Sequence, residues 1–331
     1  MQISSVGIVG GGAWGTALAQ TLAIAGRDVV LWAYEPETVN EINDLHENRT
    51  YLQDVTLSPA IRATGKLAEA AQQDVVLLVP PAQNLRGVAA ELATCFGDGR
   101  PAIICAKGIE RATGKLMADV MAEALPQALP AVLSGPSFAA DVARGLPTAV
   151  TLACADEQLG RALAEGLGYR NLRIYWSSDV TGVQLGGAVK NVLAIAAGIV
   201  EGRRLGASAH AALIARGFAE LRRLGAALGA NTETLMGLSG LGDLILTCGS
   251  TQSRNMSLGR ALGEGQTLDA ILGQRRAVTE GVYTAEAVTR LAAANAVQMP
   301  ICQAVHDIVT GSLTVDDAIE ALLNRPMKSE T

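Results

Sequence analysis

The stretch SVGIVGGGAWGTALAQTLAIAG, residues 5–26, predicts a β-strand that leads directly into an α-helix. Its first five residues resemble a buried strand, and the small residues in its second half indicate a helix that ends at Gly26. Gly10, Gly12 and Gly15 lie between the two and match G-x-G-x-x-G. This order of strand, glycines and helix is what distinguishes the motif from a chance match.

Each of these glycines has its own physical reason. Gly10 permits the tight turn, Gly12 lets the backbone approach a pyrophosphate, and Gly15 lets the helix pack closely on the strand. The free N–H groups at the start of the helix then face the phosphates. The stretch therefore predicts a dinucleotide site, and the alternative is a glycine-rich turn that binds nothing.

The rest of the chain divides into two halves of different pattern. Short apolar runs that predict strands occur at residues 5–9, 28–33, 74–79, 102–106, 131–134, 148–153 and 172–175. Helical patterns dominate afterwards, at residues 182–201, 207–228, 255–262, 285–295, 302–310 and 315–323. Such runs predict a parallel sheet covered by helices on both faces. We predict an α/β fold, with a Rossmann-type dinucleotide-binding domain at residues 1–180 and an all-helical C-terminal domain at residues 181–331.

Composition excludes several classes of partner. The chain has 331 residues, of which 49% are hydrophobic and 3% aromatic, and its formal net charge is −6. With no basic run, nucleic acid and anionic membranes are poor partners, so an anionic substrate must be held by a few local cations. The five cysteines and three histidines are scattered, which predicts reduced thiols, a cytoplasmic protein and no metal site. The N-terminus shows no basic region followed by an apolar core, so we expect no signal peptide.

Lys190 is the only charged residue in the apolar stretch of residues 180–200. A helix that is apolar nearly all round should be buried, and burial lowers the pKa of an ammonium toward the range of a proton-transfer group. We predict a catalytic lysine. One alternative is a structural lysine whose end reaches the surface. The other is a membrane span, which the glycines, Gln184 and Asn191 disfavour.

Two loops follow predicted strands at the edge of the sheet where ligands bind in open α/β folds. The run CAKG, residues 105–108, ends one strand and contains Lys107, and the loop SGPSFA begins at Ser134. In the helical half, GLSGLGD ends at Asp243, which either caps a helix or pairs with Lys190. The polar loop STQSRN, residues 250–255, combines hydroxyls, an arginine and a helix start, a suitable cradle for a phosphate.

The end of the second predicted strand bears on the choice of dinucleotide. A carboxylate that binds the ribose of NAD is expected near Ala33, but Glu35 lies two positions later. A 2′-phosphate is therefore not repelled there, although neither Tyr34 nor Arg27 is a strong clamp for it. We predict NAD(P) as cofactor, with NADPH favoured.

Taken together, these motifs resemble the soluble bacterial NAD(P)-dependent glycerol-3-phosphate dehydrogenases nearly end to end. The stretches that carry the resemblance are GGGAWGTALA (10–19), AKG (106–108), SGPSFA (134–139), GVQLGGAVKNVLAIAAGI (182–199), GLGDLILTC (240–248) and QSRN (252–255). The resemblance implies Lys190 and Asp243 as catalytic residues. It implies glycerol 3-phosphate contacts at Lys107, Gly135, Ser137, Lys190, Asn191, Asp243, Ser253, Arg254 and Asn255. It implies dinucleotide contacts at Gly10, Gly12, Ala13, Trp14, Gly15, Tyr34, Lys107, Ala139, Arg254, Val278 and Glu280.

The function expected from this resemblance is hydride transfer between sn-glycerol 3-phosphate and dihydroxyacetone phosphate, which supplies glycerol 3-phosphate for phospholipid synthesis. It also implies a homodimer. Two departures concern the dinucleotide: Tyr34 stands where relatives often have a basic residue or histidine, and Ala13 where they often have serine. The rival functions are a reductase of β-hydroxy acids and a nucleotide-sensing protein without turnover.

Overall fold

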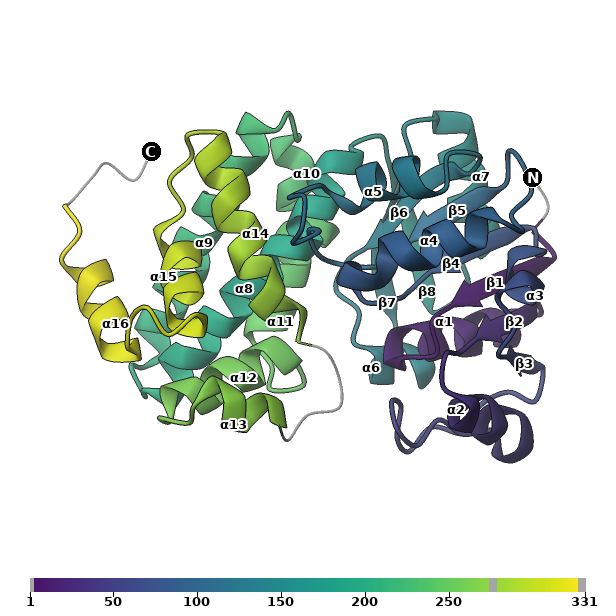
Figure 1. The fold of residues 1–331 in the computed structure, drawn as a ribbon, viewed down its shortest axis with the longest axis horizontal. Coiled ribbons are helices and arrows are strands. Elements are labelled where there is room, and N and C mark those ends of the chain that lie inside the picture. Colours follow the sequence, from purple (N-terminus) through teal and green to yellow (C-terminus); the bar gives the residue numbers. More distant parts are fainter. Residues whose placement is uncertain (1–2, 274–278, 327–331) are drawn as a thin grey trace.

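The computed structural model describes residues 3–273 and 279–326 and has a sheet part and a helical part, which lie side by side in Figure 1. The strands are β1 (Ser5–Val9), β2 (Asp28–Trp32), β3 (Ile61–Thr64), β4 (Val75–Leu78), β5 (Pro101–Ile104), β6 (Leu129–Ser134), β7 (Thr148–Ala153) and β8 (Leu172–Ser177). Their helices are α1 (Ala13–Ile24), α2 (Pro36–Asn40), α3 (Leu67–Ala71), α4 (Leu85–Ala93), α5 (Met117–Ala124), α6 (Ala139–Ala143) and α7 (Glu157–Leu167). Shorter helical turns are η1 (Glu41–Leu45) and η2 (Ala82–Asn84).

The helical part follows the last strand without returning to the sheet. It contains α8 (Val180–Gly202), α9 (Ala207–Ala227), α10 (Thr232–Met236), η3 (Leu238–Gly242), α11 (Asp243–Cys248), α12 (Arg254–Gly263), α13 (Leu268–Gly273), α14 (Glu280–Ala294), α15 (Pro300–Val309) and α16 (Val315–Leu323). An α/β half followed by an all-helical half is the predicted fold class, and it is confirmed.

The sheet differs from the prediction at two places. Its strand order is β3-β2-β1-β4-β5-β6-β7-β8, and all neighbours are parallel except β6 and β7, which are antiparallel. Residues 135–147, which include the five-residue α6, connect β6 to β7. The edge strand β3 was not predicted, because Ile61–Thr64 is short and carries an exposed Arg62.

Helices cover both faces of this sheet. One face packs against α1, α6 and α7 through side chains such as Leu18, Val142 and Leu163. The other face packs against α3, α4 and α5 through side chains such as Leu85 and Val120. Because both faces are buried, most strands are continuous apolar runs, as the sequence predicted.

Helix α8 is the centre of the helical part, and its glycines let neighbouring helices approach. A Cβ at Gly198 would lie 2.0 Å from the carbonyl oxygen of Met256, and one at Gly259 would lie 1.9 Å from that of Ile195. Thus α8 and α12 pack backbone to backbone. Among the described residues, α8 is the one helix long and apolar enough to cross a membrane, but its apolar window is wholly buried in the protein. It is a core helix.

Candidate active site

The glycine-rich turn between β1 and α1 has the geometry that a dinucleotide requires. Gly10 has φ +129°, and a Cβ there would lie 2.8 Å from the carbonyl oxygen of Val79. A Cβ at Gly15 would lie 1.9 Å from the carbonyl oxygen of Gly10, whereas one at Gly12 would meet nothing within 4 Å. The first and third glycines are therefore required by packing. The second leaves open the space that a pyrophosphate would occupy, so the turn fits a dinucleotide.

A cavity of about 850 Å³ extends from this turn to the helical part. The residues proposed from the sequence that line it are Gly10, Gly12, Ala13, Trp14, Gly15, Tyr34, Lys107, Ser137, Ala139, Lys190, Asn191, Ser253, Arg254, Asn255 and Glu280. Gly135 and Asp243 lie behind the cavity wall and reach it through hydrogen bonds to Lys107. Val278 lies outside the described residues. One cavity thus gathers residues from both halves of the chain.

Asp243 joins two ammonium groups at the centre of the site. Its Oδ1 accepts a hydrogen bond from Lys190 Nζ at 2.8 Å, and its Oδ2 accepts one from Lys107 Nζ at 2.8 Å. Lys190 Nζ also donates to Thr247 Oγ1 at 2.8 Å, and this hydroxyl is 3.1 Å from Asp243 Oδ1. Asp243 is the first residue of α11 and does not cap that helix, so the structure selects the pairing with Lys190 over the cap.

Burial dominates the electrostatics of this cluster. The side chain of Lys190 is 10% exposed and that of Asp243 is 1% exposed. The pKa of Lys190 is lowered to about 8: burial is the largest cause, the positive charge of Lys107 adds to it, and Asp243 acts in the opposite direction. Burial alone would raise the pKa of Asp243, but the two lysines outweigh burial and hold it below its usual value. Lys190 does not extend to the surface, and near neutral pH it exists in both protonation states.

Each of the two lysines has one N–H left for a ligand. An ammonium has three donors. Lys190 uses two of them on Asp243 and Thr247, and Lys107 uses two on Asp243 and the carbonyl oxygen of Gly135. Because both side chains line the cavity, the third donor of each is available to an oxygen bound there. Gly135, in the loop after β6, has φ +151°, and a Cβ added there would lie 2.8 Å from the Cα of Val150. Glycine is therefore required at this position.

A chain of amides connects the sheet to three helices of the helical part. Asn191 Nδ2 donates to the carbonyl oxygen of Lys107 at 3.1 Å, and Asn255 Nδ2 donates to Asn191 Oδ1 at 2.9 Å. Asn255 Oδ1 then accepts from the backbone N–H of Gly281 at 2.9 Å. These contacts fix α8, α12 and α14 relative to the loop after β5. Both amides therefore hold the walls of the cavity in place.

The start of α12 presents hydrogen-bond donors to the cavity. Ser253 caps this helix, with Oγ accepting from the N–H of Met256 at 3.2 Å, and Arg254 is the first helical residue. Burial lowers the pKa of Arg254 from its usual value, and the charge of Glu280 opposes that shift. Glu280 Oε1 accepts from the N–H of Ala82 at 3.0 Å. A guanidinium, a hydroxyl and a helix N-terminus thus meet at one end of the cavity and suit an anion.

Comparison with known protein families agrees with this geometry. The family model for the N-terminus of NAD-dependent glycerol-3-phosphate dehydrogenase matches residues 5–160, and the model for its C-terminus matches residues 179–320. The chain belongs to the NAD-dependent glycerol-3-phosphate dehydrogenase family.

Similar proteins cover the whole of this dehydrogenase. The glycerol-3-phosphate dehydrogenase (NAD(P)+) of Parvibaculum lavamentivorans is 61% identical over 98% of both chains. That of Maricaulis maris is 58% identical over 100% of this chain and 99% of its own. The crystal structure of glycerol-3-phosphate dehydrogenase from Coxiella burnetii superposes with a TM-score of 0.93 at 38% identity, covering 98% of this chain and 99% of that one.

Sequence reasoning missed several residues that line or support the dehydrogenase site, among them Thr247 and the backbone of Ala82. Thr247 lies four residues after Asp243, so both side chains occupy one face of α11, and this spacing was a usable signal. The backbone N–H of Ala82 contacts Glu280 across a separation of 198 residues. No local pattern could have indicated that contact.

Proposed function

We propose that this dehydrogenase interconverts sn-glycerol 3-phosphate and dihydroxyacetone phosphate with NAD(P)(H), and that Lys190 is its acid and base. The observation that carries the proposal is the buried Lys190 ammonium, which is held by Asp243 and Thr247 with one donor left over the cavity. When bound, the nicotinamide accepts hydride from C2 of glycerol 3-phosphate and returns it to the carbonyl of dihydroxyacetone phosphate. The test is the rate at which the reduced dinucleotide is oxidised when dihydroxyacetone phosphate is the substrate, compared with the rate when a β-keto acid is the substrate.

In this proposal Lys190 transfers the proton, and Lys107 donates a second hydrogen bond to the reacting oxygen. In reduction, protonated Lys190 donates its free N–H to the carbonyl oxygen at C2, and that proton moves to the oxygen as the alcohol forms. In oxidation, neutral Lys190 accepts the proton from the C2 hydroxyl. Lys107 offers a second donor from the other side of Asp243, so that two cations converge on the oxygen that gains charge. A pKa of about 8 for Lys190 suits both directions.

The phosphate of the substrate is assigned to the start of α12. We propose that Arg254, Ser253 and the N–H groups of the first helical turn hold it, so that C2 lies beside Lys190; the support is that both side chains line the cavity at the start of this helix. Asn191 and Asn255 are joined by a hydrogen bond, and we propose that they position the loop of residues 250–255 at the start of α12.

Arg254→Lys is expected to lower kcat/KM for dihydroxyacetone phosphate by an amount equivalent to about 1.5–3 kcal/mol, because an ammonium cannot form two parallel N–H···O bonds. Steady-state kinetics with dihydroxyacetone, which has no phosphate, is the control. It should be a poor substrate for the parent and lose little more in the variant. An equal proportional loss on both substrates would place Arg254 at the dinucleotide or in the fold. Comparison with the Ser253→Ala variant and the double variant then tests for a shared phosphate.

We infer that NADPH is used at least as well as NADH. Ala33 at the end of β2 is buried and packs against Gly11, so no carboxylate meets the ribose at that position. The cavity wall beyond it contains Tyr34, which is 81% exposed, and Glu35, whose carboxylate accepts from the Tyr51 hydroxyl at 3.0 Å. A substitution at Ala33 would disturb this packing, so the test belongs at Tyr34.

Tyr34→Asp is expected to lower the ratio of kcat/KM for NADPH to that for NADH about fivefold, the effect of one like-charge pair in water. Tyr34→Asn is the matched control without the charge and should leave the ratio nearer that of the parent. A parent that strongly prefers NADH would contradict the proposed use of NADPH.

Further features follow from the family. We propose that the chain divides into domains at residues 1–180 and 181–331, because the last strand ends at Ser177 and α8 begins at Val180. We also propose a cytoplasmic homodimer that supplies glycerol 3-phosphate to phospholipid synthesis. Sedimentation of the purified protein tests the dimer.

A further inference from the structure

The helical part contains a second cavity that shares no lining residue with the active site. It has a volume of about 1220 Å³ and lies between the C-terminal half of α8 and helices α9, α15 and α16. Ligand cavities in proteins typically enclose about 300–1,000 Å³ and often lie between the helices of bundles. This one is therefore large enough for an organic ligand.

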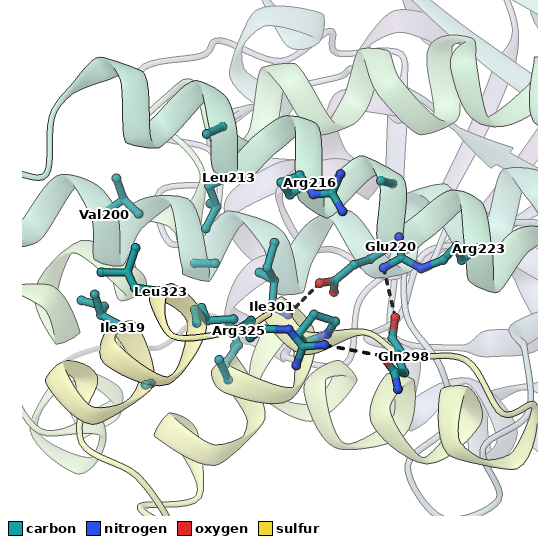
Figure 2. Close-up of a pocket in the computed structure, with 18 of the residues that line it drawn as sticks. Val200, Leu213, Arg216, Glu220, Arg223, Gln298, Ile301, Ile319, Leu323 and Arg325 are labelled. Carbon is teal, nitrogen blue, oxygen red and sulfur yellow. Dashed lines mark hydrogen bonds between the residues drawn. The ribbon is translucent and has the colours of Figure 1, made fainter. Parts of the chain in front are cut away.

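The wall of this cavity separates apolar from polar groups. In Figure 2, Val200, Leu213, Ile319 and Leu323 gather at one end, from α8, α9 and α16. Three arginines lie toward the other end, around Gln298 and Glu220: Arg216, Arg223 and Arg325. A fourth arginine, Arg222, also lines the cavity. The cavity is thus amphipathic along its length.

The arginines of the polar end form no salt bridge within the described part of the chain, and two of them donate hydrogen bonds to neutral groups. Arg223 donates to the backbone oxygen of Gln298 at 3.1 Å and Arg325 to its side-chain oxygen at 3.5 Å, both neutral groups. None of the four arginines forms a salt bridge with a residue in ranges 3–273 and 279–326. In a chain of net charge −6, four such cations around one opening are an excess of positive charge.

Glu220 is a carboxylate in the wall of this cavity, and its hydrogen bonds go to backbone groups. It is 1% exposed and accepts from the N–H groups of Ile301 at 2.7 Å and Cys302 at 3.2 Å, at the start of α15. Burial raises its pKa to about 7, against the effect of these N–H groups and of Arg223. The carboxylate of Glu220 therefore caps the start of α15, and with four arginines also in the lining the cavity wall has a net positive charge.

We infer that this cavity binds a single-chain anionic amphiphile, with the chain among the apolar side chains and the head at Arg216, Arg223 and Arg325. The apolar end gains free energy from removal of the chain from water. The guanidiniums form charge-assisted hydrogen bonds with a carboxylate or a phosphate. Neither feature alone would select this class of ligand, because an apolar end would accept a neutral chain and a basic rim would accept any anion.

Isothermal titration calorimetry with dodecanoate below its micelle concentration tests this inference without substrate or cofactor. We expect saturable binding with one site per chain and a negative heat-capacity change, which marks apolar burial. Dodecyl phosphate should bind as well, because the head site recognises negative charge. Dodecyltrimethylammonium, with the same chain and the opposite charge, should not. Equal binding of this cation, or binding that does not saturate, would overturn the inference.

Two substitutions locate the site. Arg216→Ala should weaken dodecanoate about tenfold, as expected for one lost charge-assisted contact, while Arg161→Ala on α7 should not change it. Ala212→Phe should block the chain end, and since Ala212 is exposed on α9 the ring requires no repacking of the core. Unchanged affinity in both cavity variants would refute the site.

A second copy of the chain could cover this cavity instead of the amphiphile, and sedimentation distinguishes the two. If the cavity binds the amphiphile, Ala212→Phe should leave the oligomeric state unchanged. If Ala212→Phe instead dissociates an oligomer, and dodecanoate binds only to the dissociated chains, this face is an interface and the inference fails.

Discussion

Replacement of Lys190 by methionine is expected to lower the turnover of dihydroxyacetone phosphate by about 10²–10⁴-fold, the usual effect of a positioned acid or base. Methionine keeps the length and apolar character of the side chain but cannot transfer a proton. The variant removes one partner of a buried ion pair and leaves Asp243 with the hydrogen bond from Lys107, so its stability must be measured alongside its activity. The measurement is steady-state kinetics, with dinucleotide affinity and melting temperature as checks that the site remains folded.

The pH dependence provides a second measure of the same group. With a pKa of about 8, Lys190 is protonated below that value, so kcat/KM for reduction should fall as pH rises through about 8 while kcat/KM for oxidation rises. In Lys190→Met both limbs should disappear. Lys66→Met, at an exposed lysine, is the matched control and should behave like the parent. Turnover of Lys190→Met within a few-fold of the parent would show that another group moves the proton.

The parts of the fold that the sequence predicted are those with strong local signals. Gly10 and Gly15 are required by close backbone contacts, and Lys190 is the only charged residue of an apolar helix, so both features can be recognised from the sequence. Helices α8, α9, α12 and α16 begin and end within two residues of their predicted bounds. These helices are long enough for their apolar residues to show the helical period, whereas a short apolar run can be read as either helix or strand.

Other parts depend on contacts that are distant in the sequence. The edge strand β3 is held by β2 and has too few apolar residues to be recognised alone. The apolar pattern of β7 does not encode its direction, so its antiparallel pairing with β6 could not be predicted from the sequence. In the site, the sequence left Asp243 between a helix cap and a partner of Lys190. Only the packing of η3 and α11 on α8 decides between them.

Asp243→Asn is expected to have the second large effect, because it removes the charge that two buried ammoniums share. Removal of one partner from a buried ion pair typically destabilises a protein by about 3–5 kcal/mol. Asparagine keeps the shape and one acceptor oxygen, but its NH2 group cannot accept from the second lysine, so one hydrogen bond is lost together with the charge. Without the carboxylate, the pKa of Lys190 should fall below its present value of about 8, because burial and Lys107 then act unopposed. The protonated lysine needed for reduction should become scarce at neutral pH.

The sign of the stability change distinguishes this charge effect from a loss of packing. In the Asn variant, the folded protein holds Lys190 at a pKa below the ordinary value of 10.5, so the unfolded chain binds more protons and stability rises with pH. Urea unfolding should therefore show a larger deficit relative to the parent at pH 7 than at pH 9. In the plot of kcat/KM for reduction against pH, the fall in activity should also occur at lower pH than in the parent.

Asp98→Asn, at an exposed aspartate, controls for the substitution itself and should change neither quantity. A deficit that is the same at both pH values would mean that Asp243 contributes packing or hydrogen bonds to α11 and not charge. An unshifted pH profile would then separate Asp243 from the control of Lys190. Since the geometry places one oxygen of Asp243 on each lysine, we expect both measurements to change together.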